Sequence, residues 1–114
     1  MPKYMLMLHE SPTAFKGLSP TEIQAIIQKY IDWKSRLERD GRYLGGEKLK
    51  PEGRAVRRQG SEVNVTDGPF GEVKEVVGGF FIMKADSFEH AIELAKEGPH
   101  LDRGWIEIRQ VDRE

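Results

Sequence analysis

The stretch VTDGPFGEVKEVVGGFFI, residues 65–82, predicts the end of one strand, a tight turn and the start of a second strand. Asp67 can bond backbone groups nearby, Gly68 accepts a positive φ, and Pro69 fixes φ near −65°, so the turn is expected to have one geometry. Phe70 follows as an apolar anchor for the loop. The segment after it is charged, and Gly78 and Gly79 then lead into an apolar strand predicted over residues 79–85.

Upstream of this stretch, the sequence predicts a strand, a helix, a strand and a hairpin. Residues 4–8 form a short apolar run typical of a central strand, and residues 9–18 are expected to be a loop. Ser19 and Glu22, with Pro20 between them, predict a capping box. Apolar residues then follow helical spacing until Asp40 and Gly41, at Ile23, Ile26, Ile27, Tyr30, Ile31 and Leu37, with the stem of Lys34 between them.

The remaining segments complete an alternating pattern. Residues 42–49 predict a strand in which Gly45 and Gly46 indicate a bulge or a close approach by another backbone or a ligand. Residues 55–58 and 61–65 predict a hairpin around Gln59-Gly60. Residues 86–89 predict the start of a second helix that ends at Gly98-Pro99, and residues 104–111 alternate like a half-buried strand.

This order favours one α+β domain over residues 1–114, with a ferredoxin-like antiparallel sheet and two helices on one face. Such a layout leaves the other face of the sheet bare. The strands are too apolar to face water on that side, so we expect a homodimer in which a second copy covers it.

Composition excludes several classes of function. A net charge of −1 gives no basic surface for direct binding of nucleic acid, and the absence of cysteine rules out thiolate catalysis and thiolate metal sites. No apolar run reaches the length of a signal peptide core or a membrane span, so we expect a cytoplasmic protein. His9, His90 and His100 lack the spacing of metal ligands, and the glycine pairs do not form a dinucleotide fingerprint, so no metal and no cofactor are expected.

Four motifs together resemble the DGPF-motif branch of the YCII-related family, and the resemblance covers nearly the whole chain. They are Asp67-Gly68-Pro69-Phe70, the run from Gly45 to Pro51, Ala55-Val56-Arg57 and Ile106-Glu107-Ile108-Arg109. The resemblance implies a dimer whose sheets pack together as an α+β barrel. It also implies an association with extracytoplasmic-function sigma factors.

The same resemblance implies a proton-abstracting histidine at the start of the first helix, paired with an acid. Glu22 stands at that position here, which departs from the family pattern. Glu22 therefore has two interpretations, as the acid of a capping box or as a catalytic residue. His9, at the predicted exit of the first strand, is the nearest imidazole that could act as a base.

A second set of candidates surrounds the DGPF turn. In the functional interpretation Asp67 is a base or a ligand, Arg57 or Lys74 holds a carboxylate, and Glu47 and Phe70 complete a small-molecule pocket. In the structural interpretation Asp67 caps its own turn, and the charged side chains make contacts across a dimer interface.

Two functions follow from these patterns. The first is a small-molecule-binding protein or a lyase- or isomerase-type enzyme, with a pocket between the sheet and the helices. The second is a non-catalytic interaction module linked to sigma-factor regulation.

Overall fold

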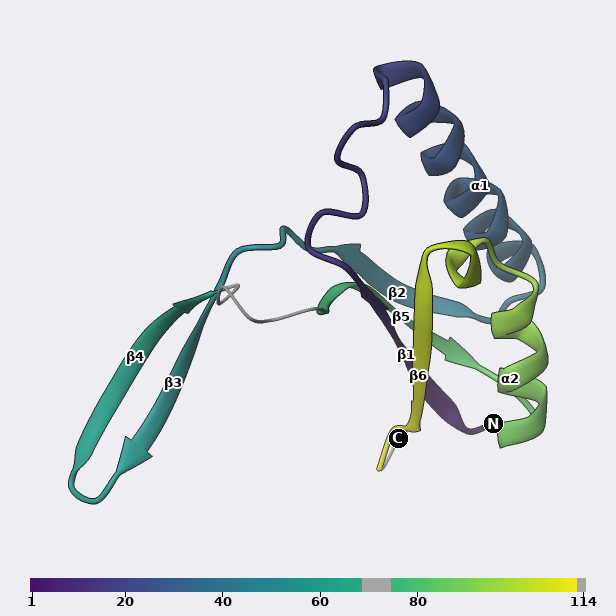
Figure 1. Cartoon of the computed structure of the whole chain (residues 1–114). Helices are drawn as coiled ribbons and strands as arrows, with labels where there is room; N and C mark the ends of the chain where they lie inside the picture. The colour runs from purple at the N-terminus through teal and green to yellow at the C-terminus, as the bar shows by residue number, and fades with distance from the viewer. Residues whose placement is uncertain (69–74, 113–114) are drawn as a thin grey trace.

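The computed structural model describes residues 1–68 and 75–112 (Figure 1). In chain order the elements are β1 (Lys3–Glu10), α1 (Pro20–Arg39), β2 (Tyr43–Lys48), β3 (Gly53–Gln59), β4 (Glu62–Gly68), β5 (Val76–Lys84), α2 (Phe88–Lys96), a 3₁₀ turn (His100–Asp102) and β6 (Gly104–Gln110). Within these ranges, no helix has the length and apolar character needed to cross a membrane.

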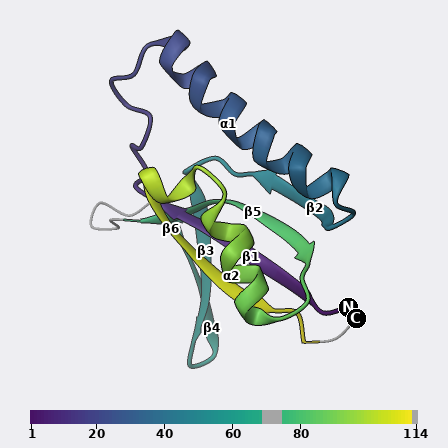
Figure 2. The ribbon, with the colours of Figure 1, turned by 90° about the vertical axis from the view of Figure 1, so that its right-hand side faces the viewer.

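Four strands form one antiparallel sheet in the order β2-β5-β1-β6. Both helices lie over the same face of this sheet, as the turned view shows (Figure 2). This confirms the predicted α+β class, with an antiparallel four-stranded sheet and two helices. The strands β3 and β4 pair only with each other, and they are inserted between two neighbouring strands of the sheet.

The core lies between the helices and the sheet. In β1 the buried residues alternate, at Tyr4, Leu6 and Leu8, so every second side chain points toward the helices. Trp33 of α1 is fully buried against them, stacks on Phe81 at 4.7 Å between ring centroids, and donates its indole N–H to the carbonyl of Leu94 at 3.1 Å. A satisfied indole N–H allows this large ring to sit at the centre of the core.

The predicted apolar stripe of the first helix needs a correction. Trp33 was missing from it, and this residue, together with Leu37, is the buried part of α1. Ile27 and Ile31 were included in the stripe but are exposed. The reason is geometric, because Ile27 and Ile31 face an open space between α1 and the sheet instead of packing on the sheet.

The helix ends are those that the sequence predicts. The Ser19 hydroxyl accepts from the backbone N–H of Glu22 at 3.1 Å, and the Glu22 carboxylate accepts from the backbone N–H of Ser19 at 2.8 Å. The capping box is therefore confirmed. Gly41, with φ of 71°, follows the C-terminal end of α1, and Ser87 caps α2.

The glycine pairs allow strands to pack closely, as predicted. A Cβ on Gly46 would collide with the carbonyl oxygen of Phe80, and a Cβ on Gly79 would lie 2.9 Å from the carbonyl oxygen of Glu47. The pairing of β2 with β5 also shifts between Tyr43 and Gly45, which is the expected irregularity.

Among the strand ends that differ from the prediction, two concern candidate site residues. β1 continues through His9 and Glu10, which were expected to begin a loop. β4 continues to Gly68, so Asp67 and Gly68 are strand residues paired with Arg54 and Gly53 rather than turn residues. The ladder of the hairpin holds the backbone in extended form past the point where turn-forming residues begin.

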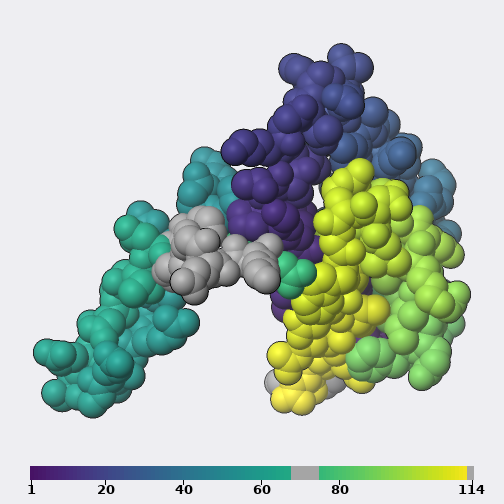
Figure 3. Space-filling view, in the orientation of Figure 1, coloured from purple at the N-terminus to yellow at the C-terminus, as the bar shows by residue number. Residues whose placement is uncertain are grey.

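The hairpin of residues 53–68, which we call the arm, projects from the body (Figure 1). It leaves on the side of the sheet opposite the helices, and the space-filling view shows it standing clear of the rest of the molecule (Figure 3). The radius of gyration is 16.1 Å, against about 13 Å for a compact domain of roughly this length. The arm accounts for this extended shape.

Candidate functional site

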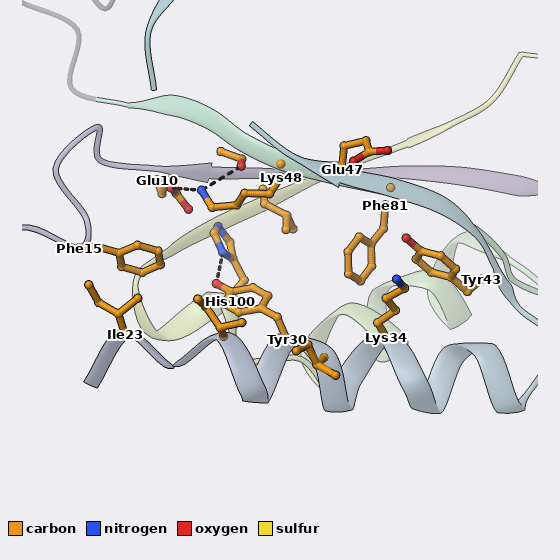
Figure 4. A pocket seen from close by; sticks show the side chains of 16 residues that line it. Glu10, Phe15, Ile23, Tyr30, Lys34, Tyr43, Glu47, Lys48, Phe81 and His100 are labelled. Atoms are coloured by element: carbon orange, nitrogen blue, oxygen red, sulfur yellow. Dashed lines mark hydrogen bonds and ion pairs between the residues drawn. The ribbon is translucent and has the colours of Figure 1, made fainter. Parts of the chain in front are cut away.

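A cavity of about 610 Å³ lies between α1 and the sheet (Figure 4). Its volume falls within the range of small-molecule sites. The lining is mainly apolar and comes from α1, from β1, β2 and β5, from the loop before α1 and from the 3₁₀ turn. The residues are Leu8, Glu10, Phe15, Ile23, Ile27, Tyr30, Ile31, Lys34, Tyr43, Gly46, Glu47, Lys48, Gly78, Gly79, Phe81 and His100.

Two features of the sequence open this space. The C-terminal half of α1 is anchored by Trp33 and Leu37, while its N-terminal end stands away from the sheet (Figures 1 and 2). Beneath that end the sheet carries Gly46, Gly78 and Gly79, which have no side chains to fill the gap. Packed interiors rarely leave a void of this size, so the cavity is the candidate ligand site.

Glu10 and Lys48 form the charged part of the lining. The Glu10 side chain is only 12% exposed, and its Oε2 lies 3.6 Å from Nζ of Lys48. Lys48 also donates to the carbonyl of Gly78 at 3.3 Å. A Cβ on Gly78 would collide with the Glu10 carboxylate, so this glycine makes the room that the carboxylate occupies.

Tyr30 and His100 form a hydrogen-bonded pair beside Glu10. The hydroxyl of Tyr30 lies 2.7 Å from Nδ1 of His100, and Nε2 of His100 lies 2.8 Å from the carbonyl oxygen of His9. A carbonyl oxygen can only accept, so Nε2 carries the proton. Nδ1 is then the acceptor, and the Tyr30 hydroxyl donates to it.

Burial keeps this pair neutral. Burial raises the pKa of the Tyr30 hydroxyl, and the nearby guanidinium of Arg103 offsets part of that effect. Burial also lowers the pKa of the His100 imidazole, partly offset by its hydrogen bond to the backbone of His9. The Tyr30 hydroxyl donates its hydrogen bond to His100. Its oxygen therefore has lone pairs left to accept a hydrogen bond from a ligand.

The other end of the cavity is aromatic. Phe81 and Tyr43 meet edge to face at 5.3 Å between centroids, and the ammonium of Lys34 lies 5.2 Å from the centre of the Tyr43 ring. Figure 4 shows this group apart from Glu10, Lys48 and His100, which gather at the opposite end. The cavity therefore has an apolar, aromatic end and a polar end.

Of the predicted site residues that the structure describes, Glu47 alone lines the cavity, and its side chain points to the other side of the sheet (Figure 4). Glu22 closes the capping box, and its hydrogen bond from the Ser19 backbone lowers the pKa of its carboxyl. His9 lies on the bare face of the sheet, where it contacts Glu107 at 3.0 Å and stacks on Trp105 at 4.0 Å.

Asp67 and Arg57 lie on the arm and do not line the cavity. Asp67 pairs with Nε of Arg54 at 3.1 Å, and Arg57 is opposite Asn64 in the ladder. The predicted ligand residues Phe70 and Lys74 lie outside the described residues, as do the rest of residues 69–74.

Sequence reasoning missed Glu10, Lys48, Tyr30 and His100 as a group. Tyr30 was placed on the inner face of the first helix, but nothing in the spacing of residues 10, 30, 48 and 100 indicates that they meet. The pairing of β5 with both β1 and β2 brings Glu10 and Lys48 together, and α1 and the 3₁₀ turn add Tyr30 and His100. Among residues 1–68 and 75–112, no three histidine or acidic side chains are arranged to hold a metal ion.

Comparison with protein families gives one finding. The model of the YCII-related domain matches residues 2–114, so the chain belongs to the YCII-related domain family. No curated protein matches the chain.

Proposed function

We propose that this YCII-related domain binds a small, largely apolar molecule in the cavity beneath α1, and that Glu10 exchanges a proton with it in a lyase- or isomerase-type reaction. The observation that carries the proposal is the Glu10 carboxylate, shielded from solvent at the polar end of an apolar cavity. The proposed site lies beneath α1 and does not include Asp67 or Arg57 of the arm.

The polar end selects the chemistry of the ligand. The Glu10 carboxylate and the Tyr30 oxygen both accept hydrogen bonds, and the Lys48 ammonium donates them. A ligand with a hydroxyl or an acidic C–H next to a carbonyl would satisfy all three groups. Its apolar part would lie against Phe81 and the isoleucines of α1.

In this arrangement Glu10 is the base. A carboxylate shielded from solvent can remove a proton from carbon next to a carbonyl, and Lys48 lies close enough to stabilise negative charge that develops on the carbonyl oxygen. Tyr30, oriented by His100, fixes the position of the ligand. A base positioned in this way contributes about 10²–10⁴-fold to a rate.

A thermal-shift screen of small hydroxy acids, lactones and aromatic ketones tests binding. A ligand at about 100 times its Kd stabilises the folded state by roughly 2.7 kcal/mol. We expect Glu10→Gln to remove or weaken that response. The matched control is Glu93→Gln, because Glu93 is an exposed glutamate on α2 that pairs with Lys96.

Deuterium exchange tests the chemistry. We expect the protein to accelerate the exchange of an acidic C–H of a bound ligand for deuterium in D₂O. NMR spectra of the ligand measure the rate of this exchange. The Glu10→Gln variant is expected to lose the acceleration. Binding without exchange would make the protein a binding module rather than an enzyme. A complete screen with no ligand response would favour the alternative function, an interaction module that contacts other proteins such as sigma factors.

A further inference from the structure

Two polar groups at the aromatic end of the cavity take no part in the proposed proton transfer. The side chain of Lys34 rises from α1 toward Tyr43, and its ammonium lies 5.2 Å from the centre of the Tyr43 ring (Figure 4). The Tyr43 hydroxyl lies beside Gly46, 3.0 Å from the position that a Cβ would occupy there. Both side chains line the cavity. A cation and a phenol thus come together at the end away from Glu10.

Both groups have hydrogen bonds left to donate. Within residues 1–68 and 75–112, no hydrogen bond or ion pair joins the Lys34 ammonium or the Tyr43 hydroxyl to another side chain or to the backbone. Glu38 follows Lys34 by one turn of α1, which is the usual spacing of a helical ion pair, yet the ammonium turns to the cavity instead. The ammonium offers three N–H donors and the phenol one O–H donor.

Tyr43 acts as a neutral donor beside the charged one. Burial raises the pKa of its hydroxyl, and the carboxylates of Glu38 and Glu47 add to this effect, so the phenol keeps its proton. Neither carboxylate occupies this end of the cavity. Glu38 is exposed and does not line it, and the Glu47 side chain points to the other side of the sheet (Figure 4).

A carboxylate attached to a flat apolar group fits these donors. It carries one negative charge for one ammonium, and its two oxygens can accept from both Lys34 and Tyr43. The ring of Phe81, which meets Tyr43 edge to face, gives the apolar group an aromatic surface to pack on. Toward the polar end the lining continues with Ile27 and Ile31 of α1, which favours an uncharged middle section of the ligand.

We propose that Lys34 and Tyr43 form a carboxylate site, and that the ligand is an aromatic or similarly flat acid whose carbonyl lies at the end opposite its carboxylate. The carboxylate contacts Lys34 and Tyr43, and the carbonyl end reaches Glu10 and Lys48. The carbonyl end of this ligand class rests on the proposed function, whereas the carboxylate end rests on Lys34 and Tyr43 alone.

Benzoate and benzamide test the carboxylate site by calorimetry, because they share one shape and differ in charge. We expect the parent protein to bind benzoate about 10-fold more tightly than benzamide. Lys34→Met keeps an apolar stem and is expected to abolish this preference, and Tyr43→Phe is expected to reduce it. Lys29→Met is the matched control, because it removes an exposed charge of α1 that does not line the cavity, and should keep the preference.

Three results of this titration would overturn the carboxylate site. They are a parent protein that binds neither compound, equal affinity for the two compounds, and a preference that survives in Lys34→Met. A preference lost in Lys48→Met but kept in Lys34→Met would place the carboxylate at the polar end, which also contradicts the proposal.

Deuterium exchange into 4-acetylbenzoate tests the whole ligand class, because its acetyl and carboxylate groups lie on opposite sides of one ring. Glu10 would take a proton from the methyl carbon, the C–H electron pair would pass into an enolate, and a deuteron from the solvent would return to that carbon. We expect Lys34→Met to raise KM for this exchange about 10-fold with little change in kcat. Glu10→Gln is expected to lower kcat.

The two experiments separate failure of the carboxylate site from failure of the proposed function. A benzoate preference that depends on Lys34, with no exchange into 4-acetylbenzoate, would confirm the carboxylate site and contradict Glu10 as the base. Exchange that depends on Glu10, with the same KM for 4-acetylbenzoate and 4-acetylbenzamide, would support the base and overturn the carboxylate site.

Discussion

Single side chains in this protein show how far local chemistry can be read from sequence. The capping box at Ser19 and Glu22 was predictable because both of its hydrogen bonds join residues three positions apart. The role of Asp67 was not, because its partner Arg54 is 13 positions away and is set by the register of a hairpin. Contacts between residues close in sequence can therefore be predicted from the sequence, whereas contacts between paired strands depend on the strand register.

The cap gives the first prediction at this scale. Ser19→Ala removes the acceptor for the backbone N–H of Glu22, and we expect the free energy of unfolding to fall by about 1 kcal/mol with the fold retained. Urea melts measure the change. Ser61→Ala, in the turn of the arm, is the control and should have little effect. An equal loss in both variants would mean that the cap contributes nothing specific.

Asp67 gives the second prediction. Its side chain is 85% exposed and its partner Arg54 is exposed as well, and such pairs contribute about 0–1 kcal/mol. Asp67→Asn and Asp67→Ala are therefore both expected to lower the free energy of unfolding by less than about 1 kcal/mol. Urea melts measure both variants. If Asp67→Ala lowers the free energy of unfolding several times more than Asp67→Asn does, the Asp67 side chain bonds a backbone group, as the turn interpretation holds.

His100 gives the third prediction, on the dependence of stability on pH. Burial lowers its pKa in the folded protein below the ordinary 6.5. At pH above 6.5 the imidazole is neutral in both states, and as the pH falls below that value only the unfolded chain gains a proton. The free energy of unfolding is therefore expected to fall on acidification through this range.

A non-titrating replacement isolates that contribution. In His100→Gln the amide can donate to the carbonyl of His9 and accept from Tyr30 without binding a proton. Urea melts over a range of pH should show a smaller loss of stability on acidification in His100→Gln than in the parent. Urea melts of the parent protein at the same pH values are the reference. An unchanged profile in His100→Gln would contradict the proposed origin.

At the scale of elements, the type and order of the segments were predictable from sequence. The helices have caps and apolar periodicity, and the core strands have apolar runs, so their existence follows from patterns within each segment. The ends of β1 and β4 were not predictable, because strands continue wherever a neighbour supplies hydrogen bonds. A pocket between the sheet and the helices was expected, but the residues that line the cavity were not predictable, since they depend on the angle at which α1 leaves the sheet.

The packing of the helix ends gives the prediction at this scale. A Cβ on Gly98, just after α2, would collide with the indole ring of Trp33 in α1. Trp33 is fully buried and cannot move away freely, so we expect Gly98→Ala to lower the free energy of unfolding by about 1–3 kcal/mol. Gly53→Ala is the control, because nothing lies near its Cβ position. Equal thermal stability of the two variants would contradict the close contact.

At the scale of the whole molecule, one chain leaves two apolar surfaces uncovered, the arm and the bare face of the sheet. The sequence predicted a second copy on the sheet, from the apolar character of the strands alone. The arm adds a second exposed apolar surface, at Val56, Val63 and Val65. A specific dimer of this kind is expected to bury more than about 1,000 Å² in total.

Trp105 provides a direct probe of that burial. It lies on the bare face, stacked on His9, and is 43% exposed in a single copy, whereas Trp33 is inaccessible in the core. We expect acrylamide to quench Trp105 fluorescence weakly at concentrations where the dimer forms and strongly after dilution to the monomer, while Trp33 stays protected throughout. Trp105→Phe keeps an aromatic ring there and reports Trp33 alone, so its quenching should not change with dilution. If the dimer forms by sedimentation while quenching of the parent protein is the same at every concentration, the two copies meet through another surface and the bare face of the sheet is not the interface.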